Sequence, residues 1–176
     1  MQGGAWLIPL RDLDDDARAI QLGAVAALRL SPGQERFVGD PLRMALAGLA
    51  EEERLPYVIE SDGRAVGVLT LQAGAASLAG WPADRTAWLL RGFLIDSRYQ
   101  GRGHGTAAAA AAAVVAAHKL TLRLQGPETG VVLSVNEENP AGLTAYRAAG
   151  FEDRGQYAGG SAGPQRIMFS GFASAA

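Results

Sequence analysis

Three glycines at alternate positions, Gly101, Gly103 and Gly105, mark the stretch of the sequence whose residue types point most directly to a chemistry. They remove Cβ atoms where a polyphosphate would have to approach, and seven alanines follow at residues 107–113. Because alanine is the best helix former, a helix is predicted to begin in or just after the glycines. Its unpaired N–H groups and positive dipole end would point at the loop, which is therefore a candidate cradle for an anion.

Glycines in this arrangement can also form a turn that merely caps a helix, and this interpretation stays open. The context favours anion binding, because the loop leaves an apolar, strand-like run and because Arg98 and Arg102 lie beside it. The dinucleotide-binding fingerprint Gly-x-Gly-x-x-Gly, with an acidic residue further on, is absent. The Gly-Lys-Ser/Thr ending of a P-loop is absent as well. If the loop binds phosphate, the phosphate belongs to another kind of carrier.

The loop resembles a known motif. Gln100-x-x-Gly103-x-Gly105 after a strand is similar to the pyrophosphate-binding motif of the GNAT superfamily of N-acetyltransferases. The resemblance implies that acetyl-CoA is the co-substrate. It also implies that the diphosphate is held by the residues of the loop, which are Gln100, Gly101, Arg102, Gly103, His104, Gly105 and Thr106.

The second half of that family's pattern follows at residues 139–151, which resemble Asn-x-x-Ala-x-x-Leu-Tyr-x-x-x-Gly-Phe. The departures are Gly142 for the usual alanine and Ala145 for the usual leucine, and they bear on helix stability more than on chemistry. The resemblance implies that Asn139 contacts CoA and that Tyr146 protonates the departing thiolate. A phenol with a pKa of about 10 is neutral at working pH and can give up its proton in this way. Taken alone, Asn139 would be a helix N-cap and Tyr146 a core residue with a wet hydroxyl.

Transfer of an acetyl group from a thioester to an amine also needs donors for the developing oxyanion and a route for the proton of the amine. The resemblance implies that backbone N–H groups of the fourth strand are these donors, here at Phe93, Leu94 and Ile95, whose main chain would also pair with the pantetheine arm. Glu60 ends the second strand and is the candidate base through a water, although a glutamate beside a hairpin is usually only solvated. Asp96 is a poorer candidate, because the turn that it begins looks structural.

The predicted elements form an α/β (α+β) fold with a mixed, mostly antiparallel sheet of six or seven strands flanked by about four helices, and the resemblance implies that this is the GNAT fold. Asp62-Gly63 predicts a hairpin, and the helix after the glycine loop makes a crossover that places strands four and five side by side and parallel. The resemblance adds that these two strands splay apart and leave a slot for pantetheine. Strands are expected at residues 6–10, 57–59, 65–71, 86–95, 131–135, 151–157 and 166–170, and helices at 17–28, 41–52, from the loop to about 118, and 139–149.

Periodicity makes two finer predictions about the core. Leu42, Leu46 and Leu49 are expected on one face of the second helix. In the fourth strand, alternation places Trp88, Leu90 and Leu94 on one side.

The acceptor is predicted from a short segment. Gln34-x-x-Phe37-Val38, ahead of a helix and a strand, resembles the N-terminal part of the spermine/spermidine-type (diamine) acetyltransferases. A polyamine or another small primary amine is therefore the preferred acceptor, while aminoglycoside amino groups and peptide N-termini remain open.

Composition bounds the remaining possibilities. At 176 residues the chain is expected to be a single domain, residues 1–176, and its net charge of −2 gives no attraction to nucleic acid or to an anionic membrane. There is no cysteine, and His104 and His118 lie far apart, so no metal site is expected. His118 is expected to interact with the helix dipole. The N-terminal residues do not resemble a signal peptide, so we expect a soluble, cytoplasmic protein, with a homodimer left open.

Two other functions compete with the enzyme. The same fold can serve as a noncatalytic acyl-CoA sensor or partner-binding module, since fold does not fix function. The glycine loop alone would also suit a nucleotide-phosphate binder.

Overall fold

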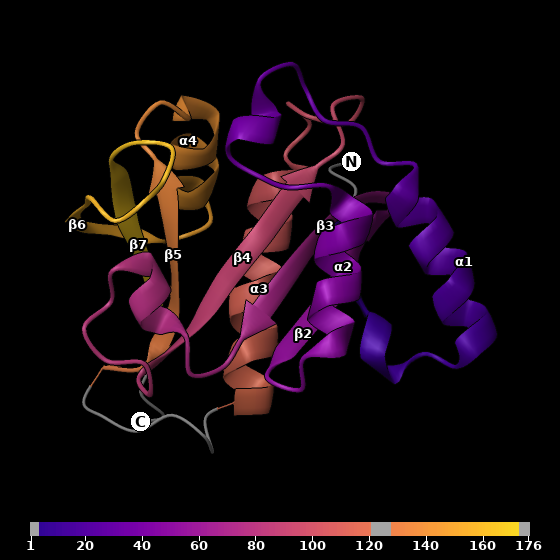
Figure 1. Ribbon diagram of the computed structural model, residues 1–176, viewed down its shortest axis with the longest axis horizontal. Helices are drawn as coiled ribbons and strands as arrows, with labels where there is room; N and C mark the ends of the chain where they lie inside the picture. Colours follow the sequence, from indigo (N-terminus) through magenta and orange to yellow (C-terminus); the bar gives the residue numbers. More distant parts are fainter. Residues whose placement is uncertain (1–3, 121–127, 173–176) are drawn as a thin grey trace. The chain divides into compact units, whose positions relative to one another are not determined.

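The computed structural model describes residues 4–120 and 128–172, with the backbone alone for residues 117–120. Its helices and strands follow the predicted order (Figure 1). Three short 3-10 helices, Leu10–Asp12, Gln34–Arg36 and Ala76–Ala79, lie in the connections. The strands and α-helices are β1 Trp6–Pro9, α1 Asp15–Ala26, α2 Pro41–Ala50, β2 Arg54–Ser61, β3 Arg64–Gln72, β4 Ala87–Ile95, α3 His104–Leu120, β5 Gly130–Asn136, α4 Pro140–Ala148, β6 Glu152–Tyr157 and β7 Gln165–Gly171.

The strands form a mixed sheet in the order β1-β2-β3-β4-β5-β7-β6. The pair β4–β5 is parallel, as a crossover through α3 requires, and its register covers Ala87–Leu89 opposite Gly130–Val132. The predicted mixed sheet with four helices is thus confirmed. By its contacts the chain divides into two compact units, one made of Met1–Leu71 with Arg91–Ala108 and the other of Gln72–Leu90 with Ala109–Ala176.

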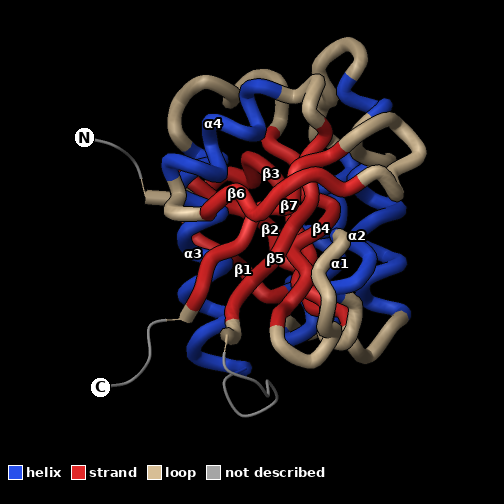
Figure 2. Tube along the Cα trace, turned by 90° about the vertical axis from the view of Figure 1, so that its left-hand side faces the viewer, coloured by secondary structure: helices blue, strands red, loops and turns tan. Residues whose placement is uncertain are grey.

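The first unit contains α1 and α2, which lie side by side in Figures 1 and 2 and pack against each other. α1 begins where the Asp14 side chain accepts a hydrogen bond from the Ala17 N–H at 2.8 Å, so the acidic cluster serves as a helix start. β1 and β2 are antiparallel, with Trp6 opposite Glu60. The core of this unit is made of Leu10, Val25, Leu28, Ala45, Val58, Val68 and Leu94.

The predicted apolar face of α2 is only partly correct, because Leu49 packs against the core and Leu42 is half-buried, whereas Leu46 is not covered. Leu46 is 46% exposed, and the buried residues of the helix are Pro41, Ala45 and Gly48. A Cβ on Gly48 would lie only 3.1 Å from the Cβ of Pro56 in β2. The close approach of α2 to β2 therefore selects small residues for the contact, which the spacing of the leucines does not reveal.

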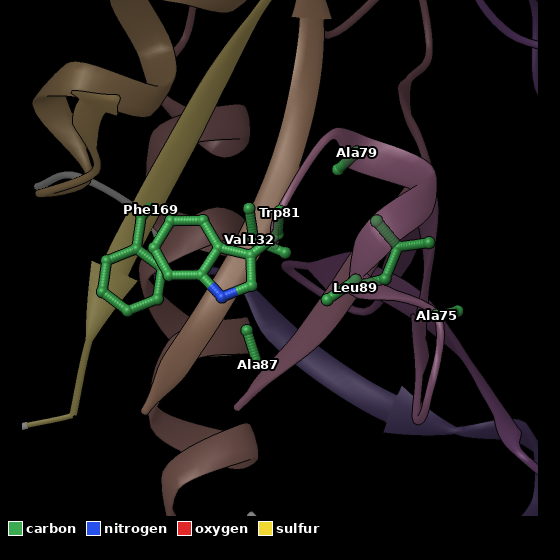
Figure 3. Packing of buried hydrophobic residues seen from close by; sticks show 8 residues of the cluster. Ala75, Ala79, Trp81, Ala87, Leu89, Val132 and Phe169 are labelled. Atoms are coloured by element: carbon green, nitrogen blue, oxygen red, sulfur yellow. The ribbon is translucent and has the colours of Figure 1, made fainter. Parts of the chain in front are cut away.

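The second unit contains β7 with β5 and β6 as its antiparallel neighbours, and a core around Trp81. Figure 3 shows the Trp81 ring stacked on Phe169, with their centroids 4.3 Å apart. The Trp81 Nε1–H donates to Thr86 Oγ1 at 2.8 Å, so the indole is fixed at both its ring and its nitrogen. The segment between β3 and β4 thus carries the buried Trp81 ring and the 3-10 helix Ala76–Ala79.

The interaction expected for the His118 side chain lies outside the described residues. Within residues 4–120 and 128–172, no helix has the length and hydropathy needed to cross a membrane. The same residues contain no cluster of three or more side chains suited to holding a metal ion.

Candidate active site

β4 leads into the glycine loop, and its backbone is irregular at Gly92. This glycine has a φ of 57° within the strand, a left-handed conformation typical of a β-bulge. A Cβ there would also lie 3.4 Å from the Met44 sulfur. The bulge interrupts the strict alternation that predicted one common side for Trp88, Leu90 and Leu94, although all three side chains are buried. The sequence does hold a signal for it, since an isolated glycine in a strand pattern often marks a bulge.

After the bulge, the N–H and C=O groups of successive residues in β4 point to alternate sides of the strand. A Cβ on Gly67 of β3 would collide with the Leu94 carbonyl oxygen, and the Asp96 N–H donates to the Val66 carbonyl at 2.8 Å. The groups of residues 94 and 96 therefore face β3. Alternation directs the main-chain groups of Phe93 and Ile95 away from β3, the direction that an added pantetheine strand requires. The side chains of Leu94 and Ile95 are buried and that of Phe93 is half-buried.

Asp96 anchors the start of the loop. Its fully buried carboxylate accepts from the Arg29 N–H at 2.9 Å, from the Arg98 N–H at 2.8 Å, and from Arg98 Nε and Nη2 at 2.9 and 2.7 Å. The hydrogen bond from the Arg98 side chain is the main reason why the pKa of Asp96 falls to about 2. The Ser97 N–H adds a bond to the Arg29 carbonyl at 2.8 Å. The turn is structural, as predicted, and Asp96 ties the loop to the segment after α1.

The glycine loop opens α3 directly. The Ala107 N–H donates to the Gly103 carbonyl at 3.0 Å, so Gly103 is the N-cap and His104 the first helical residue. The amides that an α-helix leaves without an intrahelical partner are then those of Gly103, His104, Gly105 and Thr106. Gly101 and Gly103 have φ values of 74° and 83°, which explains why glycine stands at both positions. The predicted helix start in the loop is confirmed, and the geometry suits an anion.

The alanine helix is confirmed. Its buried residues include Ala108, Ala112 and Ala116, whereas Val114 is 57% exposed. Alanine therefore supplies both the helix propensity and the buried face.

The side chain of Gln100 turns toward the protein. Its Nε2 donates to the Ile95 carbonyl at 2.8 Å and to Gln34 Oε1 at 3.2 Å, and its Oε1 accepts from Ser31 Oγ at 3.0 Å. Gln100 thus supports the loop through its side chain and can meet a phosphate through its backbone N–H. The contact with Gln34 and Ser31 was not predicted, because those residues lie far away in the sequence.

Two basic residues flank the loop in different ways. Arg98 is held by Asp96, whereas the exposed Arg102 has its guanidinium carbon 5.6 Å from the centre of the Tyr99 ring. Arg102 is the more available of the two for a phosphate.

α4 carries Asn139 and Tyr146, and both of its ends are fixed by the sequence. The Asn139 side chain accepts from the Gly142 N–H at 3.0 Å, which confirms the predicted N-cap. A Cβ on Gly142 would lie 2.7 Å from Asn139 Nδ2, so the departure from the usual alanine leaves space for the cap. Pro140 occupies the first turn, where its missing N–H costs no helical hydrogen bond.

The C-terminal end of α4 is a Schellman motif. The Phe151 N–H donates to the Tyr146 carbonyl at 3.0 Å, the Gly150 N–H donates to the Arg147 carbonyl at 3.1 Å, and Gly150 has a φ of 94°. The Phe151 ring meets the Tyr146 ring edge-on at 6.0 Å. The Tyr-x-x-x-Gly-Phe spacing is thus a helix stop that also fixes the tyrosine ring.

Tyr146 is partly buried as a whole residue, and burial raises the pKa of its hydroxyl well above the usual 10. The phenol is therefore protonated at any physiological pH. This is the state that an acid needs before it donates.

Glu60 lies near the end of β2, opposite Trp6, and is half-buried. By alternation it shares a face of the strand with Val58, which packs into the core beneath α1 and α2. Among the residues that the structure describes, no hydrogen bond or ion pair involves the Glu60 side chain.

The fold is shared with solved N-acetyltransferases. Aminoglycoside acetyltransferase AAC(6')-Ib in complex with coenzyme A and kanamycin matches with a TM-score of 0.64 and 18% identity, over 96% of this chain and 94% of that one. A spermidine N-acetyltransferase SpeG chimera from Vibrio cholerae and hSSAT matches with a TM-score of 0.58 and 16% identity, over 94% of both chains. At these identities the likeness concerns the fold.

Sequence comparison gives the family. Residues 24–151 match the Acetyltransferase (GNAT) family, and the chain belongs to it. The uncharacterized N-acetyltransferase YbbJ of Bacillus subtilis (strain 168) is 26% identical over 154 residues, which cover 84% of this chain and 89% of that protein. The chain is accordingly an acetyl-CoA-dependent N-acetyltransferase.

Proposed function

We propose that this enzyme transfers the acetyl group of acetyl-CoA to a primary amine of a small molecule, by direct attack within a ternary complex. The observation that carries the proposal is the glycine loop, whose last four residues present the unpaired amides at the start of α3. This loop would hold the diphosphate of the coenzyme, with Arg102 as a further phosphate contact. Since the family match runs through both compact units, we also propose that they form one acetyltransferase domain.

In the proposed reaction the amine nitrogen attacks the thioester carbonyl carbon, and the C–S bond breaks as the amide forms. The backbone N–H groups of Phe93 and Ile95 would stabilise the oxyanion, whereas the main-chain groups of Leu94 face β3 and would not reach it. Tyr146 would give its proton to the thiolate, since its raised pKa keeps the phenol protonated. Glu60 would accept the proton of the amine through a water. Asn139 would both cap α4 and contact CoA.

For the acceptor, the polyamine-like prediction stands beside an aminoglycoside alternative. Support for the first comes from the Gln34-x-x-Phe37-Val38 segment and from the likeness of fold to the SpeG chimera. The second is favoured by the likeness to AAC(6')-Ib. Acetyl-CoA consumption measured over a panel of polyamines, amino acids and aminoglycosides separates them.

A pair of glycine variants tests the coenzyme loop. Gly103 and Gly63 both have positive φ values, 83° and 73°, and a Cβ would meet no atom within 4 Å at either position. Alanine should therefore strain both positions by a similar amount, about 1–2 kcal/mol. We expect only Gly103→Ala to weaken acetyl-CoA binding in calorimetry, because Gly63 lies in the β2–β3 turn. Equal affinities for the two variants would contradict the role of the loop.

A further inference from the structure

The segment between α1 and α2 contains a turn that the reaction described above does not use. Ser31-Pro32-Gly33-Gln34 closes with a hydrogen bond from the Gln34 N–H to the Ser31 carbonyl at 3.0 Å. Gly33, the third residue, has φ 83° and ψ −9°, the values of a type II turn. Proline at the second position and glycine at the third are the residues that this turn favours. The local sequence therefore encodes the shape of the segment.

The side chain of Gln34 folds back over its own turn. Its Oε1 accepts from the Ser31 N–H at 2.9 Å, which closes the turn a second time. The same oxygen accepts from Gln100 Nε2 at 3.2 Å. Gln34 is half-buried and Gln100 is exposed, so the bond lies at the edge of the first unit.

Gln100 receives support from both of its ends. Ser31 Oγ donates to Gln100 Oε1 at 3.0 Å, while Gln100 Nε2 is shared between Gln34 Oε1 and the Ile95 carbonyl. The amide plane is thus held between the end of β4 and the turn. We call these three hydrogen bonds of the Gln100 side chain the Gln100 brace. Since Gln100 immediately precedes Gly101, the brace acts at the first residue of the loop.

Other contacts join the segment after α1 to the turn that follows β4. The Asp96 carboxylate accepts from the Arg29 N–H, the Ser97 N–H donates to the Arg29 carbonyl, and Arg98 Nη2 donates to the Ala27 carbonyl at 3.3 Å. Asp96 thus fixes the start of the turn between β4 and the glycine loop, and Gln34 contacts Gln100 at the end of that turn.

We propose that Gln34 is a positioning residue for the coenzyme, which holds Gln100 so that the glycine amides keep the geometry that binds diphosphate. This inference rests on the proposed role of the loop in binding acetyl-CoA. Gln34 acts through Gln100, so its loss should weaken coenzyme binding and leave the chemical step intact.

The hydrogen-bond pattern specifies which substitutions keep the function. Both groups that meet Gln34 Oε1 are donors, so a carboxylate oxygen can accept from the same two groups. Gln34→Glu should preserve the brace, whereas Gln34→Leu removes the acceptor with little change in volume. Glu35→Leu is the matched control, because it also places a leucine on the 3-10 helix, at an exposed position beside Gln34.

The test measures the Kd of acetyl-CoA by calorimetry, and kcat at saturating acetyl-CoA, for the full chain and each variant. Gln34→Leu removes both hydrogen bonds that Oε1 accepts, and the loss of the neutral bond from Gln100 should raise the Kd about fivefold. Its kcat should stay within about twofold of the unchanged enzyme. Gln34→Glu and Glu35→Leu should keep the original Kd. Ser31→Ala, which removes a single surface hydroxyl, should raise Kd by a smaller factor even if Gln34→Leu does not fold.

Three results would overturn the inference. They are an unchanged Kd for both Gln34→Leu and Ser31→Ala, a Gln34→Glu variant that binds as weakly as Gln34→Leu, and a loss confined to kcat. A loop that does not bind the coenzyme is detected separately, because Gly103→Ala would then bind acetyl-CoA as well as Gly63→Ala does.

Discussion

At the scale of single residues, Tyr146 combines a fixed ring with a hydroxyl that holds its proton. The Schellman end of α4 and the edge contact with Phe151 fix the ring, and burial raises the pKa of the hydroxyl. The departing thiolate needs a proton, and a phenol that is neutral at working pH carries one that it can give.

Replacement of Tyr146 by phenylalanine should lower kcat by about 100- to 10,000-fold, the usual contribution of a general acid. The affinity for acetyl-CoA should stay nearly the same, because the ring and its packing remain. Steady-state kinetics and calorimetry measure the two quantities. Tyr157→Phe, which removes a hydroxyl elsewhere in the same unit, is the control. A parallel loss of binding and kcat would argue for a structural role of the phenol.

Asp96 makes stability depend on pH in a defined direction. Its pKa is lowered to about 2 in the folded protein, first through the Arg98 side chain, from a usual value of 3.8. A depressed carboxyl pKa stabilises the fold above the unfolded-state pKa, and this stabilisation disappears as the pH falls through the folded-state value.

We therefore expect Asp96→Asn to lose roughly 2 kcal/mol of unfolding free energy at pH 7. The difference from the unchanged protein should shrink as the pH falls from about 4 toward 2. Urea unfolding at a series of pH values measures it. A difference that stays constant down to pH 2 would show that the carboxylate charge is not what the fold uses.

At the scale of elements, the sequence predicted the turns and helix ends that depend only on residues close together in the chain. The Asp62-Gly63 turn, the N-cap at Asn139 and the helix start within the glycine loop all follow from local backbone preferences, and all are confirmed. Element ends differ by a few residues; β2, for example, begins at Arg54 instead of residue 57.

Features that depend on contacts between distant segments could not be predicted in this way. The small face of α2 exists because Gly48 meets Pro56, and the brace at Gln100 exists because Gln34 lies beside it. Neither contact leaves a periodic trace in the sequence. The residues of the candidate site were thus found through motif spacing, while the groups that hold them in place could be identified only from the folded structure.

At the scale of the whole molecule, coenzyme binding should stabilise the fold selectively. A ligand that binds only the folded state at about 100 times its Kd adds about 2.7 kcal/mol, which is roughly 5–10 °C in melting temperature for a chain of this size. Acetyl-CoA is expected to give this shift, and ATP and NAD are expected to give none. Differential scanning fluorimetry provides the measurement, and equal shifts with ATP would favour general nucleotide binding.

The chain passes between its two compact units three times, after Leu71, after Leu90 and after Ala108. No single cut of the polypeptide can therefore release either unit whole, since each consists of two stretches interleaved with those of the other. Any shortened chain that keeps one unit whole therefore also keeps a stretch of the other, so a simple fusion or deletion cannot add or remove either unit alone.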